Sequence, residues 1–186
     1  MTLPRNISIA ANELRFSIGE SSLGAVLVAS SHKGIRAILF GSSHDWLVRE
    51  LRTACPEATL LCVDATDNDA LGQVVQLVES PRRGLDLPLD IEGTDFERRV
   101  WQAVREIPPG ATASYGDIAK RVGDPRGARE VAEACAANKL AVAIPCHRVV
   151  KADGSLSGYR WGARRKTALL AREGATMVAT NFEVKL

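Results

Sequence analysis

The chain has 186 residues, of which 46% are hydrophobic and 25% charged, a composition typical of a globular protein with one core or two small ones. No apolar run reaches the roughly 18–20 residues that a membrane helix needs, and the first residues lack signal-peptide features, so we expect a cytoplasmic or nucleoid-associated protein. The net charge of +2 is unevenly spread: residues 1–93 hold 8 Lys/Arg against 12 Asp/Glu, and residues 94–186 hold 16 against 10. This asymmetry predicts that only the second half meets a polyanion such as nucleic acid, although random scatter of surface charge gives the same numbers.

The first half of the chain has the pattern of short strands mixed with amphipathic helices. Runs rich in β-branched and apolar residues predict strands at 15–18, 23–29 and 35–40. Apolar residues at helical spacing predict helices over 44–54 and 68–78. Residues 85–91 alternate with period two and predict a half-buried strand, which Pro88 restricts to a sheet edge.

A domain boundary is predicted near Glu92 and Gly93, which divides the chain into residues 1–92 and 93–186. Thr94 and Glu97 then form a capping box that opens a helix to about residue 106, ended by the Pro-Pro-Gly run at 108–110.

Three further helices are predicted in the second half. Those over 114–122 and 126–137 are separated by Gly123, a pattern typical of a helix-turn-helix in DNA-binding proteins but also found in many enzymes. The last covers 163–172, and the final dozen residues are expected to fray.

The cysteines show no zinc-binding or disulfide pattern. None of them forms a CxxC pair, and the three histidines fit no zinc template beside them. We therefore expect reduced thiols, no bound metal and no dissociable cofactor. The four cysteines are Cys55, Cys62, Cys135 and Cys146.

The segment 143–150 places a thiol, Cys146, directly beside an imidazole, His147. A histidine that takes the proton of a thiol turns a poor nucleophile into a good one. Neighbours on a regular strand point to opposite faces, so cooperation requires an irregular backbone or a bridging water, and Pro145 favours the former. Taken alone, the pair is more often a buried cysteine beside an incidental histidine.

The amino-acid sequence around this pair resembles the active-site motif of the O6-alkylguanine-DNA alkyltransferases, also called methylated-DNA–protein-cysteine methyltransferases. The resemblance covers residues 87–174 closely and residues 15–77 more weakly, and it is greatest to the C-terminal part of the Ada-type adaptive-response proteins. It implies an α/β fold with an N-terminal ribonuclease-H-like domain of β-sheet and helices and a C-terminal winged helix-turn-helix domain. The matching segments are 96–101, 107–110, Ser114–Tyr115, Arg129, 136–140, 144–150, 156–162 and 169–173.

The resemblance also implies a role for five catalytic residues. Cys146 is the nucleophile and permanent alkyl acceptor, and His147 takes its proton through a water. Glu173 orients the imidazole, as the acid of a catalytic triad does. Tyr115 hydrogen-bonds the guanine and supports the charge left on it, and Asn138 braces the turn around Cys146.

Other interpretations of these residues stay open on the sequence alone. Glu173 fits one more charge at a helix end, Tyr115 fits a core aromatic, and Asn138 fits a helix C-terminal residue. Cys135, on the second helix of the pair, is more in keeping with packing than with chemistry.

For DNA, the resemblance implies a helix-turn-helix in the minor groove and a target base rotated out of the stack, its place filled by Arg129. Two acidic residues on the same helix, Glu130 and Glu133, depart from this pattern: they repel phosphate unless they point away or pair with Lys120 or Arg121. The DNA-binding residues implied by the resemblance are Arg129, Gly127, Ala128, Ala132, Ser114 and Arg160.

The expected activity is repair of O6-alkylguanine, and of O4-alkylthymine, in double-stranded DNA by a monomer that is consumed in one turnover. A cysteine hydrolase using Cys146, His147 and Asn138 is an alternative, as is a non-catalytic reader of alkylated DNA, against which the presence of Cys146 argues. The sequence has no cysteine-rich zinc region or regulatory domain of the Ada type, so we expect a stand-alone repair protein or an excised part of a larger one.

Overall fold

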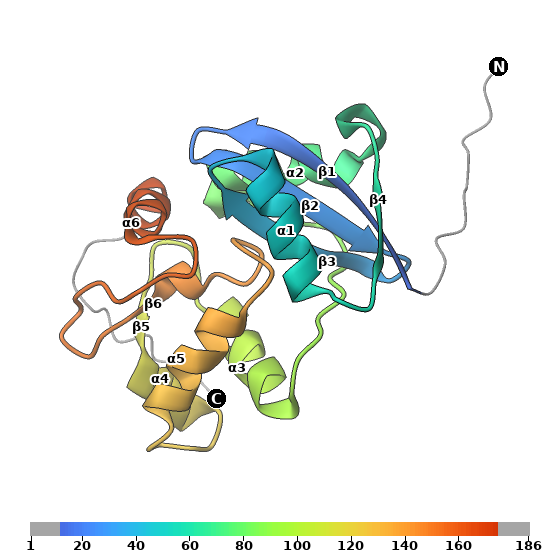
Figure 1. Ribbon diagram of the computed structural model, residues 1–186. Helices are drawn as coiled ribbons and strands as arrows, with labels where there is room; N and C mark the ends of the chain where they lie inside the picture. Colours follow the sequence, from blue (N-terminus) through green and yellow to red (C-terminus); the bar gives the residue numbers. More distant parts are fainter. Residues whose placement is uncertain (1–11, 175–186) are drawn as a thin grey trace.

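A computed structural model describes residues 12–174, and all structural statements below refer to this range. Its first part is a four-stranded sheet in the order β3-β2-β1-β4, in which β1, β2 and β3 form an antiparallel meander and β4 runs parallel to β1 (Figure 1). The strands are β1 Glu13–Ser21, β2 Gly24–Ser31, β3 Gly34–Gly41 and β4 Thr59–Cys62. Strand β4 was not predicted, because its four residues carry no alternating pattern.

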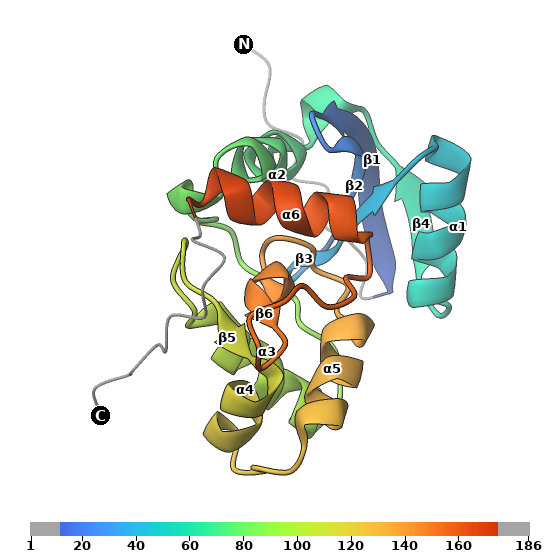
Figure 2. The ribbon, with the colours of Figure 1, turned by 90° about the vertical axis from the view of Figure 1, so that its left-hand side faces the viewer.

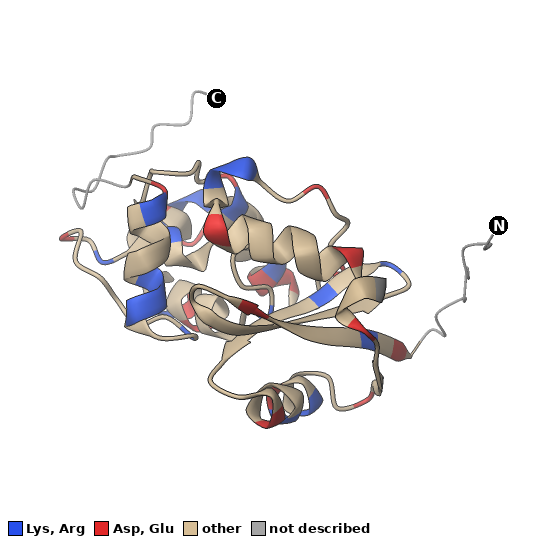
Figure 3. Cartoon of the chain, turned by 90° about the horizontal axis from the view of Figure 1, so that it is seen from above, with Lys and Arg blue, Asp and Glu red and all other residues tan. Residues whose placement is uncertain are grey.

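Two helices cover this sheet, α1 (His44–Ala54) and α2 (Asp69–Glu79), with the short 3-10 turns η1 (Ala65–Asp67) and η2 (Pro81–Arg83) on either side of α2. Both helices confirm the sequence prediction to within a residue. They lie on opposite faces of the sheet, as the view from above shows (Figure 3). β2 is buried along almost its whole length, as expected for a central strand between two helical layers.

The strand predicted over 85–91 is wrong, because this segment makes only an isolated bridge between Leu89 and Ile35. The amide of Ile35 donates to the carbonyl of Pro88, and the amide of Asp90 donates to the carbonyl of Ile35, both at 2.8 Å. The next position on the same edge, Ile38, pairs instead with the segment around Leu140. Two short segments thus share the edge of β3, and neither forms a strand.

The second part of the structure is mainly helical, and its first helix is hydrogen-bonded to a later one. A capping box at Thr94 and Glu97 opens α3, as predicted, and the indole nitrogen of Trp101 donates to the carbonyl of Ala134 on α5 at 2.8 Å. Its elements are α3 Asp95–Arg105, β5 Ala113–Ser114, α4 Tyr115–Arg121, α5 Ala128–Ala137, η3 Cys146–Arg148, β6 Val149–Val150 and α6 Ala163–Arg172.

The predicted helix pair is present, with starts one and two residues later than expected. Ser114 is the N-cap of α4 and Gly127 the N-cap of α5, so each lies just before its helix. The helix predicted over 163–172 has the predicted bounds. The predicted fraying of the last dozen residues lies outside the described part of the chain.

Helix α6 joins the two parts of the molecule, lying beside α2 and above the C-terminal helices (Figure 2). Several of its residues are Lys or Arg, coloured blue in the view from above (Figure 3). Arg165 donates to the carbonyl of Leu23 at 2.8 Å, and Arg172 donates to the carbonyl of Val78 at 2.6 Å. Side-chain donors on α6 thus hold strand and helix ends of the first part against the second. None of the described helices is long and apolar enough to cross a membrane.

Candidate active site

Cys146 lies on an irregular turn between two halves of the fold, as the prediction from Pro145 required. It begins η3, and its amide donates to the carbonyl of Ile144 at 2.8 Å. The completely buried side chain of Asn138 holds this turn: its amide nitrogen donates to the carbonyl of Ile144 at 3.0 Å and lies 3.4 Å from Sγ of Cys146. Its oxygen accepts from the amide of Leu140 at 2.8 Å. Asn138 therefore fixes the backbone that presents the thiol.

The imidazole of His147 and the carboxylate of Glu173 form a buried pair. Nε2 of His147 lies 2.9 Å from Oε1 of Glu173, and both side chains have no solvent exposure. Hydrogen bonds from His147 and Arg148 outweigh burial and lower the pKa of Glu173 to about 2, so this carboxylate is ionised and only accepts. Nε2 must then carry the imidazole proton, which leaves Nδ1 as the acceptor. Nδ1 is buried and has no protein partner among the described residues.

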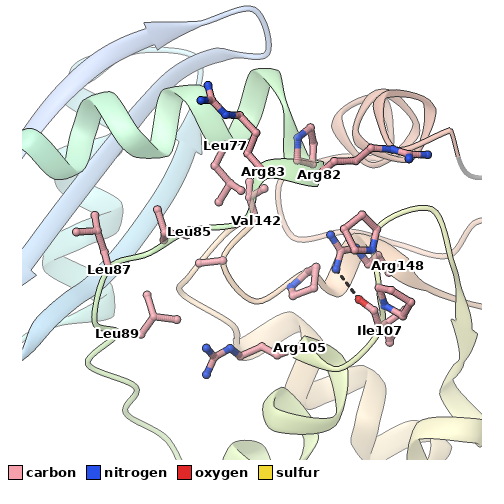
Figure 4. A pocket seen from close by; sticks show the side chains of 16 residues that line it. Leu77, Arg82, Arg83, Leu85, Leu87, Leu89, Arg105, Ile107, Val142 and Arg148 are labelled. Atoms are coloured by element: carbon pink, nitrogen blue, oxygen red, sulfur yellow. Dashed lines mark hydrogen bonds between the residues drawn. The ribbon is translucent and has the colours of Figure 1, made fainter. Parts of the chain in front are cut away.

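Two further groups, the guanidinium of Arg148 and the amide of Gly110, hold the carboxylate of Glu173. Arg148 donates from Nε to Oε2 at 3.0 Å and from Nη2 to Oε1 at 2.8 Å, and its Nη1 donates to the carbonyl of Ile107 at 2.5 Å (Figure 4). The amide of Gly110 donates to Oε2 of Glu173 at 3.2 Å. Gly110 has a φ of +89°, and a Cβ there would lie 3.0 Å from the Glu173 carbonyl. The glycine that ends the 108–110 run is thus required both by its conformation and by this close approach.

A cavity of about 450 Å³ gives the reactive thiol its access. Cys146 is only 3% exposed, but its side chain lines this cavity. The volume is within the range of small-molecule sites. The cavity is lined by Tyr115, Ala132, Cys135, Ser157, Tyr159 and Arg160 among others.

The protonation states favour activation by a base over a preformed thiolate. A hydrogen bond from the Cys146 thiol to Cys135 and burial raise the pKa of Cys146 well above its usual value, against the lowering effect of Asn138 and Lys166. Burial lowers the pKa of His147, and its contacts with Glu173 only partly oppose this. At neutral pH a protonated thiol therefore lies beside a neutral imidazole, the combination that general-base catalysis needs.

Sequence reasoning missed a second buried network on the other side of the cavity. The hydroxyls of Tyr115 and Ser157 are 2.6 Å apart, and Nζ of Lys166 donates to Oγ of Ser157 at 2.9 Å and to the carbonyl of Val149 at 2.5 Å. Lys166 has no solvent exposure, and no role was predicted for it from the sequence. The signal was available, because Lys166 stands three and four residues before the buried Leu169 and Leu170 and so shares their face.

Because the amine of Lys166 is buried, we expect the unfolding free energy of the wild type to increase with pH relative to that of a Lys166→Met variant. Burial lowers the pKa of Lys166 from 10.5 to about 8, so above pH 8 the unfolded chain binds a proton that the folded chain has lost. The free energy of unfolding therefore increases between pH 8 and pH 10.5. Urea unfolding of both proteins over this range measures the effect, and a constant difference between them would contradict it.

The predicted DNA-binding residues differ in their exposure and in their contacts within the protein. Arg129 is 88% exposed and forms an ion pair with Glu133, with Nε and Oε1 3.1 Å apart. The suggested pairing of Glu133 with Lys120 or Arg121 is wrong, because those residues pair with Asp117 and Glu106. Ala128 and Ala132 are half-buried.

Three of the predicted DNA-binding residues have roles within the fold. Gly127 is buried, and a Cβ there would lie 2.5 Å from Oδ2 of Asp124. The hydroxyl of Ser114 caps α4 by accepting from the amide of Asp117 at 3.1 Å. Arg160 donates to the carbonyl of Ala136 at 3.1 Å. Contacts within the protein account for these side chains without DNA, so a DNA contact by any of them stays a prediction.

The four cysteines are free thiols, and no three His, Cys, Asp or Glu side chains within residues 12–174 come together as metal ligands would.

The family model of the 6-O-methylguanine DNA methyltransferase ribonuclease-like domain matches residues 14–91, and the model of the DNA-binding domain of the same proteins matches residues 95–175. Together the two models cover most of the chain. The chain belongs to the 6-O-methylguanine DNA methyltransferase family.

Curated proteins similar to this chain include bacterial and archaeal members of the family. The chain is 48% identical over 160 residues to the bifunctional transcriptional activator/DNA repair enzyme Ada of Escherichia coli, covering 86% of this chain and 45% of that protein. It thus spans less than half the length of that relative. It is 33% identical to a methylated-DNA–protein-cysteine methyltransferase of Methanosarcina acetivorans, covering 86% of this chain and 98% of the relative.

Among solved structures, this chain resembles the Mycobacterium tuberculosis protein OGT in complex with DNA. The TM-score is 0.72 at 32% sequence identity, and the match covers 88% of this chain and 96% of that one. The mixed α/β fold, with a sheet part followed by a helical part, is therefore that of the family.

Proposed function

We propose that this methyltransferase repairs O6-alkylguanine, and O4-alkylthymine, in DNA by moving the alkyl group irreversibly onto Sγ of its own Cys146. The observation that carries the proposal is the buried pair of His147 and Glu173, 2.9 Å apart, in which His147 directly follows Cys146, whose side chain lines a cavity. The transcriptional activity in the name of the Escherichia coli relative is not part of the proposal.

In the proposed reaction the thiol proton passes through a water to Nδ1 of the neutral His147, whose Nε2 proton stays hydrogen-bonded to Glu173. Sγ of Cys146 attacks the alkyl carbon, and the bond between that carbon and O6 breaks with its electron pair going to the guanine. The hydroxyl of Tyr115 lines the cavity with the thiol and stabilises the negative charge left on the base. The imidazolium is stabilised by Glu173, and the product is a thioether on a consumed protein molecule.

The target base lies inside the duplex stack, so we propose that it is rotated into the cavity, with Arg129 filling the vacated space. The exposed side of the helix pair, with Ala128 and Ala132, would lie against the minor groove, together with Ser114 and Gly127 at the helix N-termini and Arg160 on the loop before α6. We further propose that the molecule acts as a monomer in the cytoplasm or at the nucleoid, with a domain boundary near Glu92.

A titration of alkylated duplex against a fixed amount of protein tests the proposed function. Transfer predicts that the number of repaired lesions levels off at one for each active protein molecule. A hydrolase that uses the same thiol would continue to turn over, and this outcome would exclude the proposal. A non-catalytic reader would bind the duplex and leave every lesion in place.

We expect Glu133→Gln to strengthen DNA binding, because the substitution removes a negative charge and frees Arg129 from its ion pair. The pair is exposed and contributes little to stability, so the variant should fold as the wild type does. The dissociation constant at low salt should fall by roughly threefold, and high salt should reduce the difference. Fluorescence anisotropy with a labelled duplex measures it, and unchanged affinity at low salt would show that Glu133 does not face phosphate.

A further inference from the structure

The C-terminal end of α6 depends on a side chain from the first part of the molecule. Glu173 is the C-cap of α6, so its backbone carbonyl has no acceptor role within the helix. Nε and Nη2 of Arg82, on η2, both donate to this carbonyl, at 3.1 and 2.6 Å. A guanidinium donates in this forked manner with little freedom, because its nitrogens are fixed in one plane.

The neighbouring arginine makes no such contact. Arg82 points toward the end of α6, whereas Arg83 points the other way, over α2 (Figure 4). The side chain of Arg83 has no hydrogen bond or ion pair with any described residue. Both Arg82 and Arg83 line a cavity of about 340 Å³ between the two parts of the molecule. Arg82 and Arg83 therefore differ in one contact while sharing charge, element and exposure.

The contact matters because one residue carries both the carbonyl and the catalytic carboxylate. The backbone of Glu173 is held by Arg82, and its carboxylate reaches His147, Arg148 and the amide of Gly110. A shift of the backbone at 173 moves the carboxylate away from the imidazole, and small displacements of this kind weaken catalysis strongly.

We propose that Arg82 is a positioning residue for alkyl transfer, through which the N-terminal sheet part of the protein holds the Glu173 carboxylate against His147. The inference rests on the proposed function. Arg82 touches neither the thiol nor the cavity that Cys146 lines. Its effect reaches the reaction only through residue 173.

The ionisable groups around His147 determine how its pKa should change when the Glu173 carboxylate is displaced. Glu173 faces the ring from the end of α6, Lys166 from within α6, Arg148 from η3, and Tyr159 from the loop before α6. Of these, only Glu173 raises the pKa of His147, whereas Arg148 and Lys166 lower it. A misplaced carboxylate therefore lowers the pKa of His147 further, and the pH at which the imidazole is half-protonated falls.

The test compares Arg82→Met with Arg83→Met as the matched control and Arg82→Lys as the conservative variant. Single-turnover transfer should slow roughly tenfold in Arg82→Met. In Arg83→Met it should change by less than about twofold, as for a surface substitution without partners. Arg82→Lys keeps one donor for the carbonyl and should recover part of the rate. Arg165 and Arg172 tie α6 to the first part independently, and thermal unfolding of each variant checks that the fold is kept.

An NMR titration of the His147 ring gives a readout that does not depend on activity. The pKa of His147 should fall in Arg82→Met and stay at the wild-type value in Arg83→Met. Equal rates and equal His147 titrations in the two Met variants would overturn the inference while leaving the proposed function intact. A wild type that transfers no alkyl group would overturn the proposed function, and the NMR comparison would still decide whether Arg82 positions Glu173.

Discussion

Cys146→Ala should abolish alkyl transfer and leave binding to alkylated duplex DNA close to that of the wild type. The substitution removes the only atom that can accept the alkyl group in the proposed reaction, whereas the exposed side of the helix pair is unchanged. The side chain is small and buried, and the turn that carries it is held by the hydrogen bonds of Asn138 to backbone groups, which alanine keeps. Repair assays and anisotropy on the same preparation measure both quantities.

Cys62→Ala is the matched control for this variant. Cys62 is an exposed free thiol on the edge strand β4 and does not line the cavity, and Figure 1 shows β4 on the opposite side of the molecule from β5 and β6. Its removal should leave transfer at the wild-type rate. Residual transfer by Cys146→Ala, or loss of transfer in Cys62→Ala, would show that Cys146 is not the acceptor.

Glu173→Gln should reduce both transfer and stability, because it leaves the buried guanidinium of Arg148 without its counter-charge. Removing one partner of a buried ion pair costs about 3–5 kcal/mol of unfolding free energy. A neutral amide also stabilises the imidazolium poorly, so transfer should slow by roughly 100-fold, within the range that general-base catalysis supplies. Urea unfolding and single-turnover assays give the two numbers.

The stability difference between wild type and Glu173→Gln should depend on pH in one direction. The pKa of Glu173 is about 2 in the folded protein against a usual 4.5, so its contribution is complete above about pH 4.5 and is lost as the pH falls toward 2. The two unfolding curves should therefore approach each other as the solution is acidified. A difference that stays constant from pH 6 to pH 3 would show that the carboxylate is not held as an ion.

The sequence predicted most helices and the order of chemistry-bearing residues, because these depend on local patterns. The capping box at Thr94 and the helix over 163–172 are specified by residues within a few positions of each other. The proposed catalytic residues Cys146, His147 and Glu173 were predicted from the resemblance of the sequence motifs around them to those of the family. Their proximity was an expectation that the 2.9 Å contact between His147 and Glu173 now supports.

What the sequence could not predict depends on contacts between distant segments. The segment 85–91 alternates as a strand does, but the edge of β3 that it needed is shared with residues near Leu140. Lys166 shares a helix face with Leu169 and Leu170, but only the fold shows that Ser157 and the Val149 carbonyl satisfy its amine in the interior. The hold of Arg82 on Glu173 joins residues 91 positions apart, a pairing without any local signal.

The most direct test of the account is to locate the transferred group. The protein is incubated with excess duplex carrying O6-methylguanine and digested, and each cysteine-containing peptide is weighed by mass spectrometry. We predict that the peptide with Cys146 gains the mass of one methylene group in nearly every active molecule and that the peptides with Cys55, Cys62 and Cys135 gain nothing. Repair of the duplex with an unmodified Cys146 would contradict the account.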